Sequence, residues 1–143
     1  MLTTLYSITG LALLAAVGVY ALLRGGALER YAMGVATLGW LASLGVQSVS
    51  GIFDPVVGFL LIDTIAFAAL VGLTWRSGRR WPLFAAGFQG LALSVDGMRV
   101  VSPHLSRWVY LTALAAAGYG LLAAIVFGTW EAGRLRVLAP AND

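Results

Sequence analysis

Apolar stretches of about 20 residues recur along the chain and are separated by short segments rich in Arg, Gly, Pro and Trp. The hydrocarbon core of a bilayer is about 30 Å thick, and a helix rising about 1.5 Å per residue crosses it in about 20 residues. The pattern therefore predicts an all-α membrane protein, a bundle of five transmembrane helices. The expected helices cover residues 2–23, 31–50, 55–75, 82–101 and 103–130. Residues 1–130 then form a single transmembrane bundle, residues 24–30 a polar link, and residues 131–143 a short cytoplasmic tail.

Three of the four prolines support these helix boundaries. Pro55 follows Asp54, Pro103 follows Ser102, and Pro82 lies directly before an apolar run. Asp and Ser are favoured N-cap residues, and proline is tolerated at the first helical position because the missing N–H has no partner there. These signals predict that the third, fourth and fifth helices begin at the prolines.

The charged residues predict an orientation. Only 10% of the chain is charged, 60% is hydrophobic, and all nine basic residues are Arg. When five helices alternate, seven arginines fall on one side: Arg24, Arg30, Arg76, Arg79, Arg80, Arg134 and Arg136. Arg99 and Arg107 fall on the other. Because cytoplasmic loops carry the excess of arginine, we expect the N-terminus outside and the C-terminus in the cytoplasm.

The same composition excludes several classes of function. Five spans leave only about 40 residues for loops and tail, too few for a catalytic or nucleic-acid-binding domain. The absence of Cys excludes thiolate metal sites, and no phosphate-binding, dinucleotide-binding or hydrolase motif is present. We therefore expect no enzymatic activity, no cofactor and no nucleic-acid partner. His104 is the only histidine, and we expect an interfacial residue there rather than a ligand of haem or pigment.

Polar residues within the spans are the candidate functional residues. Asp63 lies about 12 Å from the outer end of its helix, where a carboxylate costs several kcal/mol unless it is paired, protonated or hydrated. The helix over 82–101 has one small and polar face and an opposite apolar face, and Asp96 and Arg99 on the polar face are spaced to pair. We predict one buried polar network in the outer half of the membrane, formed by Gln47, Asp63, Gln89, Asp96 and Arg99.

This network has three possible roles. Polar side chains between membrane helices often hold the helices together. A buried carboxylate also suits a proton, ion or substrate path. A third possibility is a docking surface for a polar group of another subunit. The first role is favoured, because a transporter usually needs more acidic or ligand groups near the midplane.

The last helix carries small residues at every fourth position. Ala116, Gly120 and Ala124 lie on one face, which allows two helix backbones to approach closely. Packing inside the bundle, against the first, second or third helix, is favoured over a homodimer contact. Four tryptophans near helix ends are typical of the aromatic belt at a membrane surface. They are Trp75, Trp81, Trp108 and Trp130.

The segment 61–89 contains Ile62 followed by Asp63, and then the sequence WRSGRRWP over 75–82. In this segment the chain resembles small uncharacterised multi-span inner-membrane proteins of α-proteobacteria, which carry a basic loop followed by Trp-Pro. The resemblance implies the bacterial inner membrane and implies no activity.

These patterns lead to one main hypothesis about function. We expect a non-enzymatic integral membrane protein that is a subunit or scaffold of a larger assembly, with the lipid bilayer and other membrane subunits, or further copies of itself, as partners. One alternative is a small oligomeric ion or proton transporter or channel that uses Asp63. Another is a holin-like protein that permeabilises the membrane.

Overall fold

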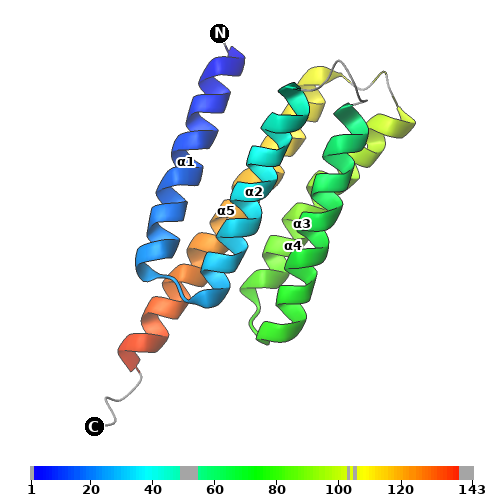
Figure 1. Cartoon of the computed structure of the whole chain (residues 1–143). Coiled ribbons are helices and arrows are strands. Elements are labelled where there is room, and N and C mark those ends of the chain that lie inside the picture. Colours follow the sequence, from blue (N-terminus) through cyan, green and yellow to red (C-terminus); the bar gives the residue numbers. More distant parts are fainter. Residues whose placement is uncertain (1, 49–54, 103, 105, 139–143) are drawn as a thin grey trace.

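The chain is all-helical in the residues that the computed structural model describes, which are 2–48, 55–102, 104 and 106–138, with side chains from Ile8 onward. The five helices are α1 (Leu2–Arg24), α2 (Ala27–Ser48), α3 (Pro55–Ser77), α4 (Trp81–Val101) and α5 (Arg107–Leu138). Helices α2, α3, α4 and α5 pack in sequence, α5 also contacts α2, and α1 packs against α5 and α2 (Figure 1). The prediction of five helices is confirmed for this part of the chain.

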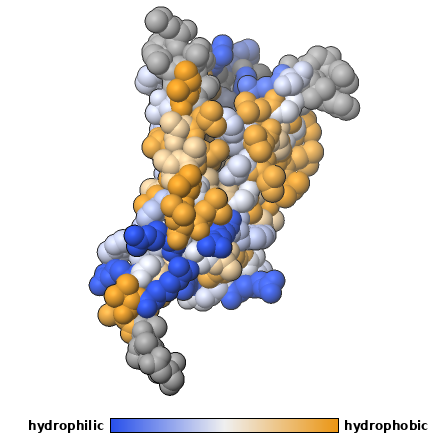
Figure 2. Space-filling model, turned by 60° about the vertical axis from the view of Figure 1, so that its left-hand side comes forward, coloured by the Kyte–Doolittle hydropathy of each residue, from blue (hydrophilic) through white to orange (hydrophobic). Residues whose placement is uncertain are grey.

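Two of these helices, α3 and α5, are long and apolar enough to cross a membrane. The part of α1 from Ile8 to Arg24 is a shorter apolar helix. Figure 2 shows hydrophobic residues across the middle of the molecule and hydrophilic residues gathered toward its lower end. The apolar band on this face is compatible with membrane association.

The connection between α1 and α2 is shorter than the predicted link over 24–30. Only Gly25 and Gly26 are non-helical, and α2 begins at Ala27 rather than at residue 31. The N–H of Gly25 donates to the carbonyl of Ala21, and a Cβ at Gly25 would collide with that carbonyl oxygen. The next four residues are Ala, Leu, Glu and Arg, all strong helix formers, so the helix resumes at once.

The predicted start and end of the last helix are also wrong. Helix α5 begins at Arg107 rather than at residue 103, because Ser102 caps the end of α4, where its N–H donates to the carbonyl of Met98. The carbonyl of Ser106 accepts the first helical bond of α5, from the N–H of Tyr110. At the other end α5 continues past Trp130 to Leu138, so most of the predicted tail is helical.

The proline signals are consistent with two other helix starts. Helix α3 begins at Pro55 as predicted, whereas its expected cap, Asp54, lies outside the described residues, as does Pro103. Helix α4 begins at Trp81 with proline in its first turn. Gly78 has a φ of 61°, a left-handed conformation that suits glycine and ends α3.

Helices α4 and α5 pack along small residues. Gly120 lies at this contact with α4 rather than against one of the first three helices as expected, Ala124 is buried, and the stripe continues to Gly128. A Cβ at Gly120 would collide with the ring of Phe88, and one at Gly128 would lie 2.5 Å from Cδ2 of Trp81. Ala116 is exposed, so the predicted stripe is displaced by one turn toward the C-terminus.

The prediction that Trp81 belongs to an aromatic belt is wrong. Trp75, Trp108 and Trp130 are exposed, but the side chain of Trp81 is 0% exposed. Because Gly128 has no side chain, the indole ring fits against the α5 backbone. Trp81 therefore belongs to the hydrophobic core, together with Leu70 and Ile125.

The glycines of α5 give the first prediction. Gly128→Leu is expected to destabilise the fold by about 1–3 kcal/mol or more, because Trp81 is enclosed and has no room to move. Gly120→Leu is expected to cost less, since Phe88 lies at the edge of the bundle. The measurement is thermal unfolding of the purified protein in mild detergent.

Gly118→Leu is the matched control, because a Cβ at Gly118 meets no atom within 4 Å. Equal stability of all three variants would contradict the α4–α5 contact.

Candidate functional site

Three helices bring polar side chains together in what we call the acidic cluster, formed by Asp63, Gln89, Asp96, Arg99 and Tyr110. Asp63 comes from α3, Tyr110 from the first turn of α5, and the others from α4. Nε2 of Gln89 donates to Oδ1 of Asp63 at 3.0 Å, and the hydroxyl of Tyr110 donates to Oδ1 of Asp96 at 2.6 Å. The side chain of Asp96 is only 3% exposed.

The two carboxyl groups lie on the same side of the α3–α4 contact. Gln89, which bonds to Asp63, and Asp96 are seven residues apart on α4 and therefore share one face of that helix. Asp63, Gln89 and Asp96 thus form a polar contact between α3 and α4, and Tyr110 extends it to α5.

Arg99 joins the cluster differently from the expected pairing with Asp96. Its guanidinium carbon lies 4.5 Å from the centroid of the Tyr110 ring, and its side chain is exposed. Asp96 is short and points toward α5, whereas the long Arg99 side chain, one turn later, reaches outward over the ring. Tyr110 thus contacts both Asp96 and Arg99, which the sequence predicts to pair directly with each other.

Gln47 does not join this network. It is exposed near the end of α2, and no hydrogen bond found among the described residues joins it to Asp63, Gln89, Asp96 or Arg99. The hydroxyl groups of Thr37 and Ser43 on the same helix donate to carbonyls of α2 itself. These two side chains are therefore satisfied within α2.

The acidic cluster offers two carboxyl groups, an amide and a phenol, which suit hydrogen bonding to one another or to a small polar group. Among the described residues there is no group of three or more His, Cys, Asp and Glu side chains that could hold a metal ion. His104 is exposed in the turn between α4 and α5.

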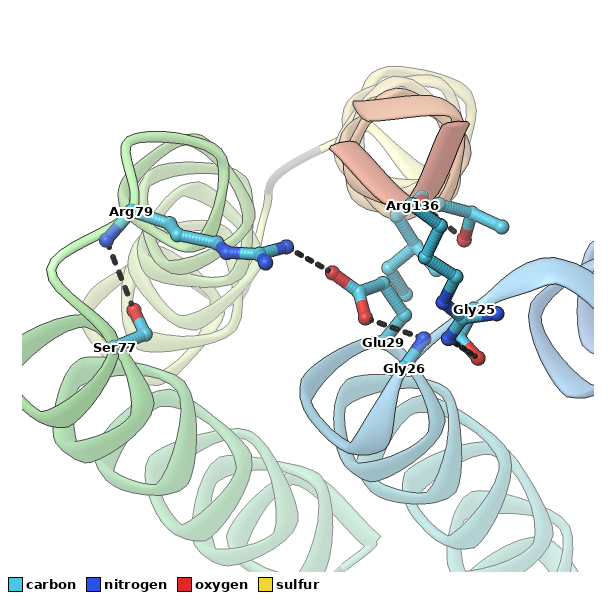
Figure 3. A network of polar contacts seen from close by, with 8 residues as sticks. Gly25, Gly26, Glu29, Ser77, Arg79 and Arg136 are labelled. Carbon is cyan, nitrogen blue, oxygen red and sulfur yellow. Dashed lines mark hydrogen bonds and ion pairs between the residues drawn. The ribbon is translucent and has the colours of Figure 1, made fainter. Parts of the chain in front are cut away.

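A second polar site lies at the opposite end of the bundle and was not anticipated. The side chain of Glu29 is 1% exposed; its Oε1 lies 3.1 Å from Nη1 of Arg79, and its Oε2 accepts the N–H of Gly26 at 2.8 Å (Figure 3). Nη2 of Arg136 donates to the carbonyl of Gly25 at 3.0 Å. These contacts join the α1–α2 turn to the α3–α4 turn and to the end of α5.

The sequence did contain a signal for Glu29. A glutamate three residues after a helix-capping residue commonly reaches back to bond the N–H of that residue. Gly26 and Glu29 have this spacing. No comparable local signal identifies Tyr110, because its partner is 14 residues away on another helix.

Comparison of the chain with protein-family models, with curated proteins and with solved structures finds no match. The geometry of these two sites and the surface around them are therefore what indicates a function.

Arg79 gives the second prediction. Arg79→Gln leaves the Glu29 carboxylate buried without its cation, and we expect a loss of about 1–3 kcal/mol in stability. The measurement is again the thermal unfolding midpoint in mild detergent.

Arg80→Gln removes the same charge from the next residue, which is exposed and forms no ion pair with any described residue. Its midpoint is expected to equal that of the wild type. An equal loss in both variants would show that total charge matters and the ion pair does not.

Proposed function

We propose that the chain is an integral membrane protein of the bacterial inner membrane, with five transmembrane helices, and that it is a non-enzymatic subunit or scaffold of a larger membrane assembly. The observation that carries this proposal is that the buried polar side chains bond to one another. In the acidic cluster and around Glu29 they bond to each other across helices, which is the role of interhelical glue.

The outer surface supports a membrane location for all five helices. Large apolar side chains are exposed on each of them, including Leu22 on α1, Leu38 on α2, Ile65 on α3, Phe84 on α4 and Phe127 on α5. On α4 the buried polar residues face the bundle, so the apolar face that remains is available to lipid.

The arrangement of the arginines supports an orientation. The α1–α2 turn, the α3–α4 turn and the end of α5 lie at one end of the bundle, which we call the basic end (Figure 1). The seven arginines grouped by alternation belong to these segments. The positive-inside rule then favours the basic end in the cytoplasm and the N-terminus outside.

A small proton or ion transporter is the second candidate. The observation that favours it is the position of two carboxyl groups, Asp63 on α3 and Asp96 on α4, in one polar cluster, because acidic side chains inside a membrane bundle are one element of a proton path. In this alternative the charge change at Asp63 is the mechanism itself, whereas in the main proposal Asp63 only holds α3 to α4.

Topology gives the third prediction. The chain has no cysteine, so single cysteines are free of background. We expect His104→Cys to react with a membrane-impermeant thiol reagent in intact cells, and Arg80→Cys to react only after the inner membrane is opened. Both side chains are exposed. The reverse pattern would invert the orientation, and labelling of both in intact cells would contradict five spans.

The subunit proposal gives the fourth prediction. Purification of the full chain in mild detergent is expected to recover distinct partner proteins in fixed stoichiometry, for the wild type and for Asp63→Asn alike. The amide keeps the size and most of the hydrogen bonding of the carboxyl group, so the helix contact survives.

A pure homo-oligomer whose liposomes show a pH-driven ion flux would contradict this, provided that Asp63→Asn abolishes the flux while its unfolding midpoint stays unchanged. That result would establish the transport alternative.

A further inference from the structure

An apolar groove of about 670 Å³ runs between α1 and α5. Leu13, Val17 and Tyr20 line it on α1, and Val126, Phe127 and Trp130 line it on α5. The two helices pack side by side and run in the same direction, toward the basic end (Figure 1). The volume of the groove is within the range of pockets that hold small ligands.

An arginine continues the groove-lining stripe of each helix. On α1, Arg24 follows Val17 by seven positions and Tyr20 by four, and on α5, Arg134 follows Trp130 by four. Residues three and four apart share a helix face, so both arginines lie at the basic end of the groove. The guanidinium carbon of Arg134 lies 4.9 Å from the centroid of the Trp130 ring, which places its charge at the groove itself.

These two cations form no ion pair with any residue that the structure describes. Both side chains are exposed, and the ion pair between Arg79 and Glu29 is the only one in this part of the chain. Glu131, three residues before Arg134 on α5, forms none with it. An apolar groove that ends at two arginines without an ion pair is complementary to an amphiphile with an apolar chain and a negatively charged headgroup.

We propose that this groove binds one anionic phospholipid, with an acyl chain along α1 and α5 and the phosphate at Arg24 and Arg134. The inference rests on the proposed membrane location. The alternative occupant, a second copy of the chain, is disfavoured by charge. A two-fold contact through this groove would bring Arg24 and Arg134 of both copies to the same level, where four like charges repel.

The test is native mass spectrometry of the full chain in mild detergent with equimolar phosphatidylglycerol and phosphatidylcholine that have identical acyl chains. The wild type is expected to retain one phospholipid, with about a tenfold preference for phosphatidylglycerol, since each arginine near an anionic surface contributes severalfold. Arg24→Gln/Arg134→Gln is expected to lose this preference. Ala123→Phe, which narrows the groove without changing charge, is expected to reduce retention of both lipids.

The matched control is Arg76→Gln/Arg80→Gln, which removes two exposed arginines of the basic end that lie away from α1 and α5. It is expected to keep the wild-type preference. An equal loss in this control would overturn the proposal in favour of general surface charge, and so would a wild type without preference. Disulfide-linked dimers of Ala123→Cys would show a second copy in the groove. Lipid retention is measured on the isolated chain, so it is independent of whether partner subunits are found.

Discussion

The close approach of α4 and α5 is the contact on which the other features of the bundle depend. Gly120, Ala124 and Gly128 keep the α5 surface shallow, so the ring of Trp81 enters the core and the first turn of α5 comes within reach of Asp96. The same position of α5 lets it contact α1 and α2 on its other sides. A side chain larger than glycine at the Trp81 contact would separate the two helices and, with them, the acidic cluster. Backbone proximity therefore comes first, and the polar contacts follow from it.

Polar contacts connect the helices near both ends of the bundle, and the two sets differ in character. In the acidic cluster, Gln89 and Tyr110 are neutral donors to carboxyl groups, and an interhelical bond of this kind contributes about 0.6 kcal/mol and rarely above about 2. At the basic end a buried carboxylate pairs with a partly exposed guanidinium and with a backbone N–H. Because the carboxylate is buried, removing one partner destabilises the fold by more than the intact pair stabilises it. The basic end is thus the more sensitive of the two to single substitutions.

The sequence predicts features that depend on a single helix, such as its buried face. It does not predict features that depend on the contact between two helices. The apolar face of α4 and the buried positions of Ala85, Ala86, Gln89 and Asp96 follow from helical periodicity alone. The boundaries at Ala27 and Leu138 do not follow from the sequence pattern, because Gly and Arg are typical of loops, although Arg, Leu and Ala are also strong helix formers. Gln47, Arg99 and Trp81 were misplaced because periodicity gives the face of a helix but not which neighbour covers it. Tyr110 was missed for the same reason.

Short connections restrict where this chain can be recognised. At the basic end, two residues join α1 to α2 and three join α3 to α4, so neither turn offers a surface of its own. The C-terminal turns of α5 are held through Arg136 against Gly25. In the proposed membrane location, a partner that approaches the bundle at this end therefore contacts mainly the helix faces, where the exposed residues are largely apolar. At the level of Arg24 and Arg134, the apolar groove between α1 and α5 comes next to two exposed arginines. The proposed selectivity for an anionic lipid would arise at this level of the bundle.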